Sequence, residues 1–194
     1  ALLHGILEIA VGATAAKRGS LLLYDAEAEQ LTVGAAIGIE AELIPAIVLP
    51  LGDGIAGRVF ETGRGQLVSG KVSPSDYRIA HERYDVDSAI SAPMVDHDGG
   101  LGVLNLSRAK HETPFSDDDL RFVEQIGRLA AAMIRRAQNH RRLDAQASRL
   151  QIREHVRHEL STNAPMPERL AQVCRLIAQE VNAGICNLYL YEPG

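Results

Sequence analysis

The sequence predicts an α+β fold built on an antiparallel β-sheet. Two pairs of short apolar runs, 20–25 with 31–38 and 88–95 with 101–108, are each joined by a turn-rich segment, which is typical of β-hairpins. The turn of the second pair contains Asp98-Gly99-Gly100, a strong signal for a tight turn. Helical patterns precede and follow these strands.

The other elements before residue 110 follow from apolar spacing and turn residues. Apolar runs at 46–51 and 66–70 predict two further strands, and Pro50 favours an edge or the end of a strand for the first of them. Residues 71–87 are polar and predict a loop with a helical turn around 76–84. A helix is expected at the start of the chain, because apolar residues recur there every three or four positions: Leu2, Leu3, Ile6, Leu7, Ile9 and Ala10.

A long helix is predicted over residues 117–160. Ser116 and Asp119 have the spacing of a capping box, and the acidic run "SDDD" suits the positive end of a helix. Neither glycine nor proline interrupts 128–164, and Pro165 and Pro167 end the pattern. Such a helix would be about 65 Å long at 1.5 Å per residue, which is more than one small domain can cover.

One apolar stripe on this helix is expected to need a partner. A second copy of the chain is the simplest one, so the stripe predicts a homodimer through a coiled coil. Its residues follow a three-four spacing: Val123, Ile126, Ala130, Met133 and Ala137.

Composition indicates an ordinary globular protein and weighs against several functions. Apolar residues make up 46% and charged residues 23% of the 194 residues, and the net charge of -5 gives no reason to expect nucleic acid or an anionic membrane as a partner. No apolar run approaches the roughly 20 residues that span a bilayer. Cys174 and Cys186 lack metal-ligand spacing. A reducing, cytoplasmic location fits these features best.

The stretch "PLGDGIAGRVFETG" contains Gly52, Gly54 and Gly57 in the spacing of the dinucleotide-binding fingerprint. That motif requires a strand, a full helix and a second parallel strand. Here a hairpin precedes the glycines, and the segment before the next strand allows about two and a half helical turns. The glycines are therefore interpreted as backbone bends that bring Gly57 close to the sheet.

Three segments in order resemble the GAF domain family: "GDGIAGRVFETGRGQLV", "SAISAPMVDHDGGLGVLNLSR" and "PFSDDDLRFVEQIGRLAAAMIRRA". The resemblance covers 1–137. It implies an α+β, α/β/α-like fold: a central antiparallel sheet of five or six strands, helices packed on one face, a ligand pocket on the other, and a long C-terminal signalling helix. It also implies sensing or dimerisation without catalysis, upstream of an effector domain.

The end of the chain repeats the plan of its start. "RLAQVCRLIAQEVNAGICNLYLYEPG" has the helix, small-residue turn and apolar strand with which the sequence opens, and it resembles the beginning of a second GAF domain. The predicted organisation is therefore a GAF sensory domain at 1–137, a linker helix at 138–165 and a truncated second GAF domain at 166–194, in a fragment of a longer protein whose effector lies C-terminal to it.

The family contains several ligand classes, and no cofactor is identified among them. Bilin-binding members and methionine sulfoxide reductases use pocket cysteines, which the first domain lacks. Cyclic-nucleotide-binding members resemble this chain at Asn105, Lys110, Phe115 and Asp119, but Leu120 stands where they have an acid. Haem-binding members use a histidine in the region of His81.

Residues around the polar segment 66–91 are the candidates for contact with a small ligand, because polar loop residues over an apolar sheet face can orient one. The alternative is an ordinary surface loop over a filled pocket. Arg78 could bind a carboxylate or phosphate, and the two tyrosines could cap it. The candidates are Ser69, Asp76, Tyr77, Arg78, Tyr84, Asp87, Ser88 and Ser91.

Three further motifs have simpler interpretations than the chemistry they suggest. "DHDGG" is interpreted as a solvated turn rather than a metal site. "RRAQNHRR" is basic but lacks interleaved aromatics, which favours a solvated helix face over nucleic-acid binding. "RHELSTNAP" resembles the phospho-acceptor segment of histidine kinases, with His158 as acceptor, but that family has proline directly after the threonine. A histidine-kinase fragment is the alternative to a sensory module.

Overall fold

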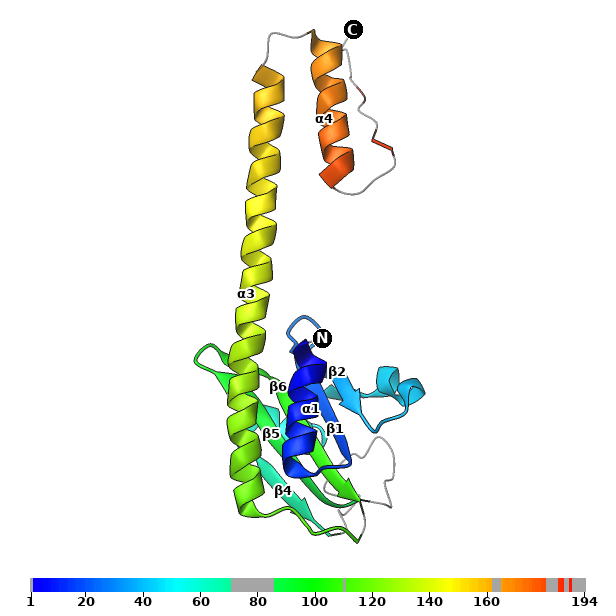
Figure 1. The fold of residues 1–194 in the computed structure, drawn as a ribbon, viewed down its shortest axis with the longest axis vertical. Coiled ribbons are helices and arrows are strands. Elements are labelled where there is room, and N and C mark those ends of the chain that lie inside the picture. Colours follow the sequence, from blue (N-terminus) through cyan, green and yellow to red (C-terminus); the bar gives the residue numbers. More distant parts are fainter. Residues whose placement is uncertain are drawn as a thin grey trace. The chain divides into compact units, whose positions relative to one another are not determined.

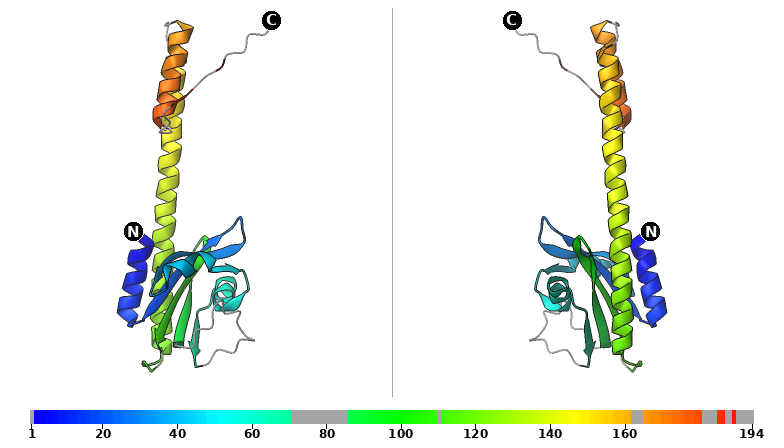
Figure 2. Two further views of the ribbon diagram at one scale, coloured as in Figure 1. Left: turned by 90° about the vertical axis from the view of Figure 1, so that its right-hand side faces the viewer. Right: turned by 90° about the vertical axis from the view of Figure 1, so that its left-hand side faces the viewer.

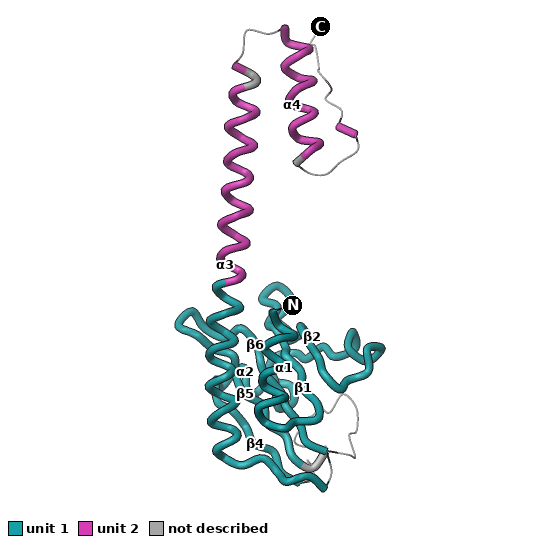
Figure 3. Tube along the Cα trace, viewed as in Figure 1, with its two compact units in different colours: residues 1–136 teal, residues 137–194 magenta. Residues whose placement is uncertain are grey.

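The computed structural model describes residues 2–70, 86–109, 111–161, 165–180, 185–186 and 189. The chain forms two compact units, 1–136 and 137–194 (Figure 3). The first unit contains a six-stranded sheet in the order β3-β2-β1-β6-β5-β4, in which every neighbouring pair is antiparallel. This confirms the α+β fold with an antiparallel sheet.

The elements agree closely with the expected ones (Figure 1). Both predicted hairpins form, and β3 and β4 are the two edge strands. The 3₁₀ helix η1, which contains Pro45, was not predicted. The elements are α1 Leu2–Thr14, β1 Arg18–Asp25, β2 Gln30–Ile37, η1 Ala41–Ala46, β3 Val48–Pro50, α2 Gly54–Thr62, β4 Gln66–Ser69, β5 Val86–Asp96, β6 Gly99–Ala109, α3 Asp117–Ser161 and α4 Met166–Glu180.

Helices from both ends of the first unit pack on one face of the sheet (Figure 2). Leu7 of α1, Val123 of α3 and Leu104 of β6 are fully buried in this larger core. Because strand residues alternate between faces, even-numbered side chains of β5 and β6 supply most of the sheet's contribution, and Leu21 of β1 and Leu101 of β6 add to it. The even-numbered ones are Ile90, Ala92, Met94, Leu104 and Leu106.

The opposite face of the sheet packs against α2 (Figure 2). Val59 of α2 is fully buried in a smaller core with Leu22 and Val103, and the rings of Tyr24 and Phe60 lie 4.6 Å apart. The two sheet faces therefore have separate apolar cores, one under α1 and α3 and one under α2.

The glycine motif bends the chain into α2. Gly52 and Gly54 have φ values of 75° and 65°, which favour glycine, and a Cβ on Gly57 would lie 3.0 Å from the Pro50 carbonyl oxygen. Gly57 thus packs against the end of β3. The helix stops at the left-handed Gly63, and the following strand β4 is antiparallel to its neighbour β5. A dinucleotide-binding unit is excluded, since it needs parallel strands.

The long helix α3 begins at the predicted cap. The Ser116 hydroxyl accepts the Asp119 N–H at 3.2 Å, and the Asp119 carboxylate accepts the Ser116 N–H at 2.8 Å. The predicted dimer stripe needs correction, however. Val123 and Ala130 are buried in the core of their own unit, because this face of α3 packs against the sheet. These two side chains are therefore not available to a second chain.

In the second unit, α4 forms where a fresh helix was predicted. The predicted strand at the C-terminus lies mostly outside the described residues, and the described Ile185, Cys186 and Tyr189 are not in a strand. Among the helices of the described ranges, none is both long enough and apolar enough to cross a membrane.

Candidate functional site

A row of polar side chains crosses the α2 face of the sheet. Ser20 of β1 lies opposite Asn105 of β6, which lies opposite Ser91 of β5. The Ser91 hydroxyl donates to Asn105 Oδ1 at 2.7 Å, and Asn105 Nδ2 donates to the Ser20 hydroxyl at 3.4 Å. Gln66 of β4 lies opposite Ser91 and extends the row to a fourth strand. We call Ser20, Asn105, Ser91 and Gln66 the polar row.

The row lies on an otherwise apolar face. Leu22 and Val103 share the parity of Ser20 and Asn105 on their strands and belong to the core under α2. Ser91 is buried, while the other three members are partly buried. Buried polar groups in folded proteins are usually hydrogen-bonded, as these are. A row whose donors and acceptors are not all used within the protein can also orient a small molecule.

The structure separates the predicted ligand residues that it describes. Ser91 belongs to the polar row, whereas Ser88 is buried on the helix face, where its hydroxyl accepts the Phe115 N–H at 2.9 Å. Ser88 therefore positions the start of α3 and is not part of the row. Ser69 is exposed at the end of β4. Outside the residues whose side chains are described lie Asp76, Tyr77, Arg78, Tyr84 and Asp87.

Two of the four residues shared with cyclic-nucleotide-binding members have structural tasks here. Phe115 is buried in the larger core with the Arg108 guanidinium 4.1 Å from its ring centroid, and Asp119 caps α3. Asn105 is in the polar row, while Lys110 and His81 lie outside the described residues. His158 is exposed near the end of α3.

Two members of the row, Ser20 and Gln66, were not among the residues predicted from the sequence. The available signal was a polar residue at a single position of an apolar strand, as in "SLLLYD" and "VLNLS". Such residues are ambiguous on their own, because cross-strand register decides whether they meet. Register places Ser20 and Ser91 on either side of Asn105, although they are 71 positions apart in the chain (91 − 20).

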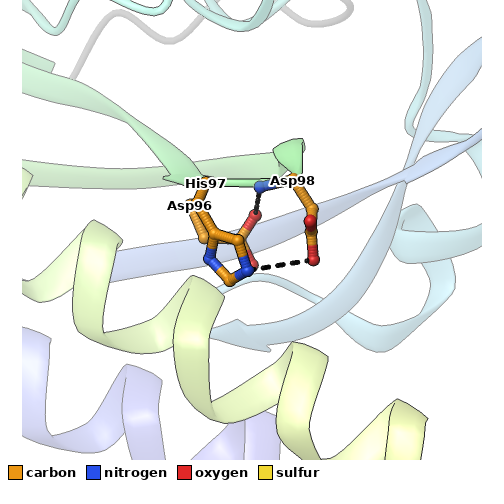
Figure 4. Close-up of side chains that lie close together, drawn as sticks. All are labelled: Asp96, His97 and Asp98. Carbon is orange, nitrogen blue, oxygen red and sulfur yellow. Dashed lines mark hydrogen bonds and ion pairs between the residues drawn. The ribbon is translucent and has the colours of Figure 1, made fainter.

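The β5–β6 turn holds Asp96, His97 and Asp98, whose ligand atoms lie within 4.8 Å of one another (Figure 4). Asp96 is already engaged by a cation: Arg135 of α3 donates from Nε and Nη2 to its two carboxylate oxygens, both at 3.1 Å. These hydrogen bonds lower the pKa of Asp96. Because the guanidinium provides the positive charge, the turn is better suited to fastening α3 than to binding a metal.

Replacing Asp96 with Asn is expected to lower the denaturation midpoint of the first unit at pH 7. A carboxylate whose folded-state pKa is lowered stabilises the fold above its ordinary pKa of 3.8, and this stabilisation is lost as the pH falls through the lowered value. The difference in denaturation midpoint between wild type and Asp96→Asn should therefore be largest near neutral pH and should disappear in strong acid. Denaturation curves at several pH values measure it. Asp98→Asn is the control, since Asp98 is more exposed and lies 3.9 Å from Arg135; an equal effect of both variants would contradict the bidentate contact.

The comparisons with known proteins agree with this fold. The family model of the GAF domain matches residues 1–135. The second GAF domain of DevS from Mycobacterium smegmatis is similar at 20% identity and a TM-score of 0.61, covering 73% of this chain and 96% of that one. Among curated proteins, none matches the chain.

Two further solved structures are similar to the same region. Residues 122 to 287 of a methyl-accepting chemotaxis protein match at 20% identity and a TM-score of 0.59, with 69% of this chain and 87% of that chain covered. Free methionine-R-sulfoxide reductase from Neisseria meningitidis matches at 18% identity and a TM-score of 0.60, with 71% and 78% covered. At such identities the likeness shows a shared fold, which hosts both regulatory and enzymatic proteins.

Proposed function

Because the chain belongs to the GAF domain family, we propose that its first unit is a non-enzymatic regulatory module, which binds a small polar molecule on the α2 face of the sheet and passes that state to α3. The polar row is the observation that supports this proposal. Its hydroxyls and amides are uncharged, so they suit a neutral ligand that has both donors and acceptors.

The geometry of Ser91 favours binding over catalysis. A serine nucleophile needs a neighbouring base to remove its proton. Ser91 instead donates to an amide oxygen of Asn105, which is a very weak base. Asn105 contributes one N–H and one acceptor position to the bonds within the row, and its amide has a second N–H and further acceptor capacity for a ligand.

A route from the ligand face to α3 passes around the β4 edge. The Gly65 N–H, just after α2, donates to Glu124 Oε1 of α3 at 3.0 Å. A Cβ on Gly127 would lie 2.6 Å from the Pro93 carbonyl oxygen, so α3 also presses closely on β5. In the proposed mechanism, a ligand that shifts α2 changes the position of α3 on the sheet. An effector C-terminal to this sequence then responds to the movement of α3.

We further propose that the module works in the cytoplasm as a homodimer through α3, with neither nucleic acid nor membrane as a partner. The net charge of -5 supports the last point, since phosphate backbones and anionic lipids attract basic surfaces. The basic side chains near residue 135 are partly engaged within the fold, because Arg135 binds Asp96.

Asn105→Ala tests the ligand site. Native mass spectrometry of wild-type protein purified from cells is expected to show a retained small molecule, and titration of that molecule should give roughly tenfold to hundredfold weaker binding to the variant, since one or two hydrogen bonds are lost. Gln125→Ala, which removes an exposed amide on α3, should leave binding unchanged. Full binding by a folded Asn105→Ala protein would exclude the polar row as the site.

A further inference from the structure

The two cysteines of the chain are in contact with each other in the second unit. Cys174 lies in the middle of α4 and Cys186 follows that helix, and both are free thiols and partly buried. The two thiols are hydrogen-bonded to each other. Such a pair can be joined by a disulfide without a large movement of the backbone, because that bond needs Cβ atoms only about 3.5–4.5 Å apart.

The segment that contains both cysteines repeats the start of the chain. It aligns with the first 25 residues without a gap, and "LLLY" of the first copy stands as "LYLY" in the second. Cys174 takes the place of Leu7 and Cys186 that of Gly19, both at a separation of 167 positions (174 − 7 and 186 − 19). The repeat therefore relates the cysteine pair to a helix position and a strand position of the first unit.

In the first unit these two positions touch. A Cβ on Gly19 would lie 2.8 Å from Leu7 Cδ1, so there is no room for a second side chain beside the leucine. In the second unit a shorter side chain replaces the leucine, and a thiol replaces the glycine hydrogen. The two changes are complementary, because the space that the leucine would fill accepts the second sulfur. Although Cys186 is not in a strand, it contacts α4 at the corresponding residue.

We propose that Cys174 and Cys186 form a modification site, at which a low-molecular-weight disulfide such as oxidised glutathione converts the two thiols into an intramolecular disulfide. The bond fastens the segment after α4 to that helix. In a reducing compartment such a bond is transient, which is typical of a redox-sensing pair. Neither the ligand site nor the homodimer of the proposed function takes part in it.

The exchange takes place in two steps. The thiolate of one cysteine attacks the oxidant, which forms a mixed disulfide and releases one low-molecular-weight thiolate. The thiolate of the other cysteine then attacks the protein sulfur of that mixed disulfide and releases the second. The released thiolates take up the two protons that the cysteines lost, and two electrons pass from the cysteine pair to the oxidant. An excess of the reduced thiol reverses both steps.

Proximity, rather than a high thiolate fraction, directs the reaction to this pair. Burial and the contact with Cys186 raise the pKa of the Cys174 thiol. At neutral pH this thiol is therefore mostly protonated and reacts slowly with reagents in solution. The second step is intramolecular, so the other sulfur is present at a high effective concentration.

A redox titration of the full chain tests the site. The protein is equilibrated with mixtures of reduced and oxidised glutathione and quenched with acid, and its mass is measured after alkylation of the remaining thiols. The matched control is Cys174→Ser with Arg175→Cys, which moves one cysteine by one position and about 100° around α4, to an exposed site. The wild-type pair is expected to form the intramolecular disulfide with an equilibrium constant about tenfold larger or more, since only its thiols are in contact.

The same titration in urea separates the folded contact from simple loop closure. The loops of the two proteins differ by one residue, so the unfolded chains should close them with similar equilibrium constants. Equal constants for the two pairs in buffer, or a tenfold difference that persists in urea, would overturn the site. Glutathione adducts on both wild-type thiols, or a disulfide between two chains, would overturn it as well.

Amide hydrogen exchange measures what the bond does to the fold. In the oxidised wild type the amides of α4 around Cys174 should exchange about tenfold more slowly than in the reduced protein, because the bond opposes local opening of the helix. Cys186→Ser, which cannot form the bond, should show no such slowing in the same oxidising buffer. A disulfide that forms without slowing the exchange would contradict the fastening of the segment to α4.

Discussion

Gly102→Ala is expected to lower the free energy of unfolding of the first unit by about 3 kcal/mol, near the upper end for overpacked cores. Gly102 lies in the central strand β6, opposite Leu23 on one side and Met94 on the other. A Cβ there would lie 1.9 Å from the Leu22 carbonyl oxygen and 2.8 Å from Met94 Cε. The first of these neighbours is backbone, so relief requires β1 to move away from β6.

Denaturation of the full chain followed by circular dichroism measures this effect. Gly5→Ala in α1 is the matched control, because the Cβ it would introduce has no described atom within 4 Å apart from its chain neighbours and the backbone of its own helix. Alanine is favoured over glycine in a helix interior, so this variant should gain up to about 1 kcal/mol. Similar denaturation midpoints for the two variants would show that β1 and β6 can move apart at little cost in stability. That result would contradict the close packing of the central strands around Gly102.

Local patterns in the sequence were sufficient to predict the sheet, its hairpins and the long helix. Asp98-Gly99-Gly100 turns β5 into β6, with Gly99 at a φ of 115°, and the cap at Ser116 and Asp119 forms as its spacing indicates. These features depend on residues within a few positions of one another. A short stretch of sequence is therefore sufficient to predict them.

The candidate site was only partly predictable, because it depends on register between distant strands. Ser88 and Ser91 are both serines in one short segment, yet they project from opposite faces of β5. The apolar stripe of α3 shows the same limit. The spacing of Val123 and Ala130 marks a buried face equally well whether the partner is the chain's own sheet or a second chain. Only the tertiary arrangement shows that Val123 and Ala130 pack against the chain's own sheet.

Arg108→Ala is expected to cost about 3 kcal/mol of stability and to loosen the attachment of α3. Arg108 Nη1 donates to the carbonyl oxygens of Thr113 at 2.9 Å and Pro114 at 3.2 Å, and Nη2 donates to that of Thr14 at 2.5 Å. Nη1 is shared between two carbonyl groups, so we count one hydrogen bond of about 1.5 kcal/mol for each of the two donor nitrogens. Truncation also removes the contact with the Phe115 ring. One side chain thus ties the end of α1 to the segment that leads into α3.

The Arg108→Lys variant distinguishes the contribution of the positive charge from that of the planar guanidinium group. Lysine keeps the charge but cannot reach three carbonyl groups with the same rigid geometry, so it should recover less than half of the loss. Amide hydrogen exchange provides the second measurement: in both variants the amides at the start of α3 should exchange faster, while those of β2 should keep their protection. Wild-type stability in Arg108→Lys would mean that charge alone holds this junction. Unchanged exchange in Arg108→Ala would mean that Ser88, whose hydroxyl accepts the Phe115 N–H, is sufficient to position the helix.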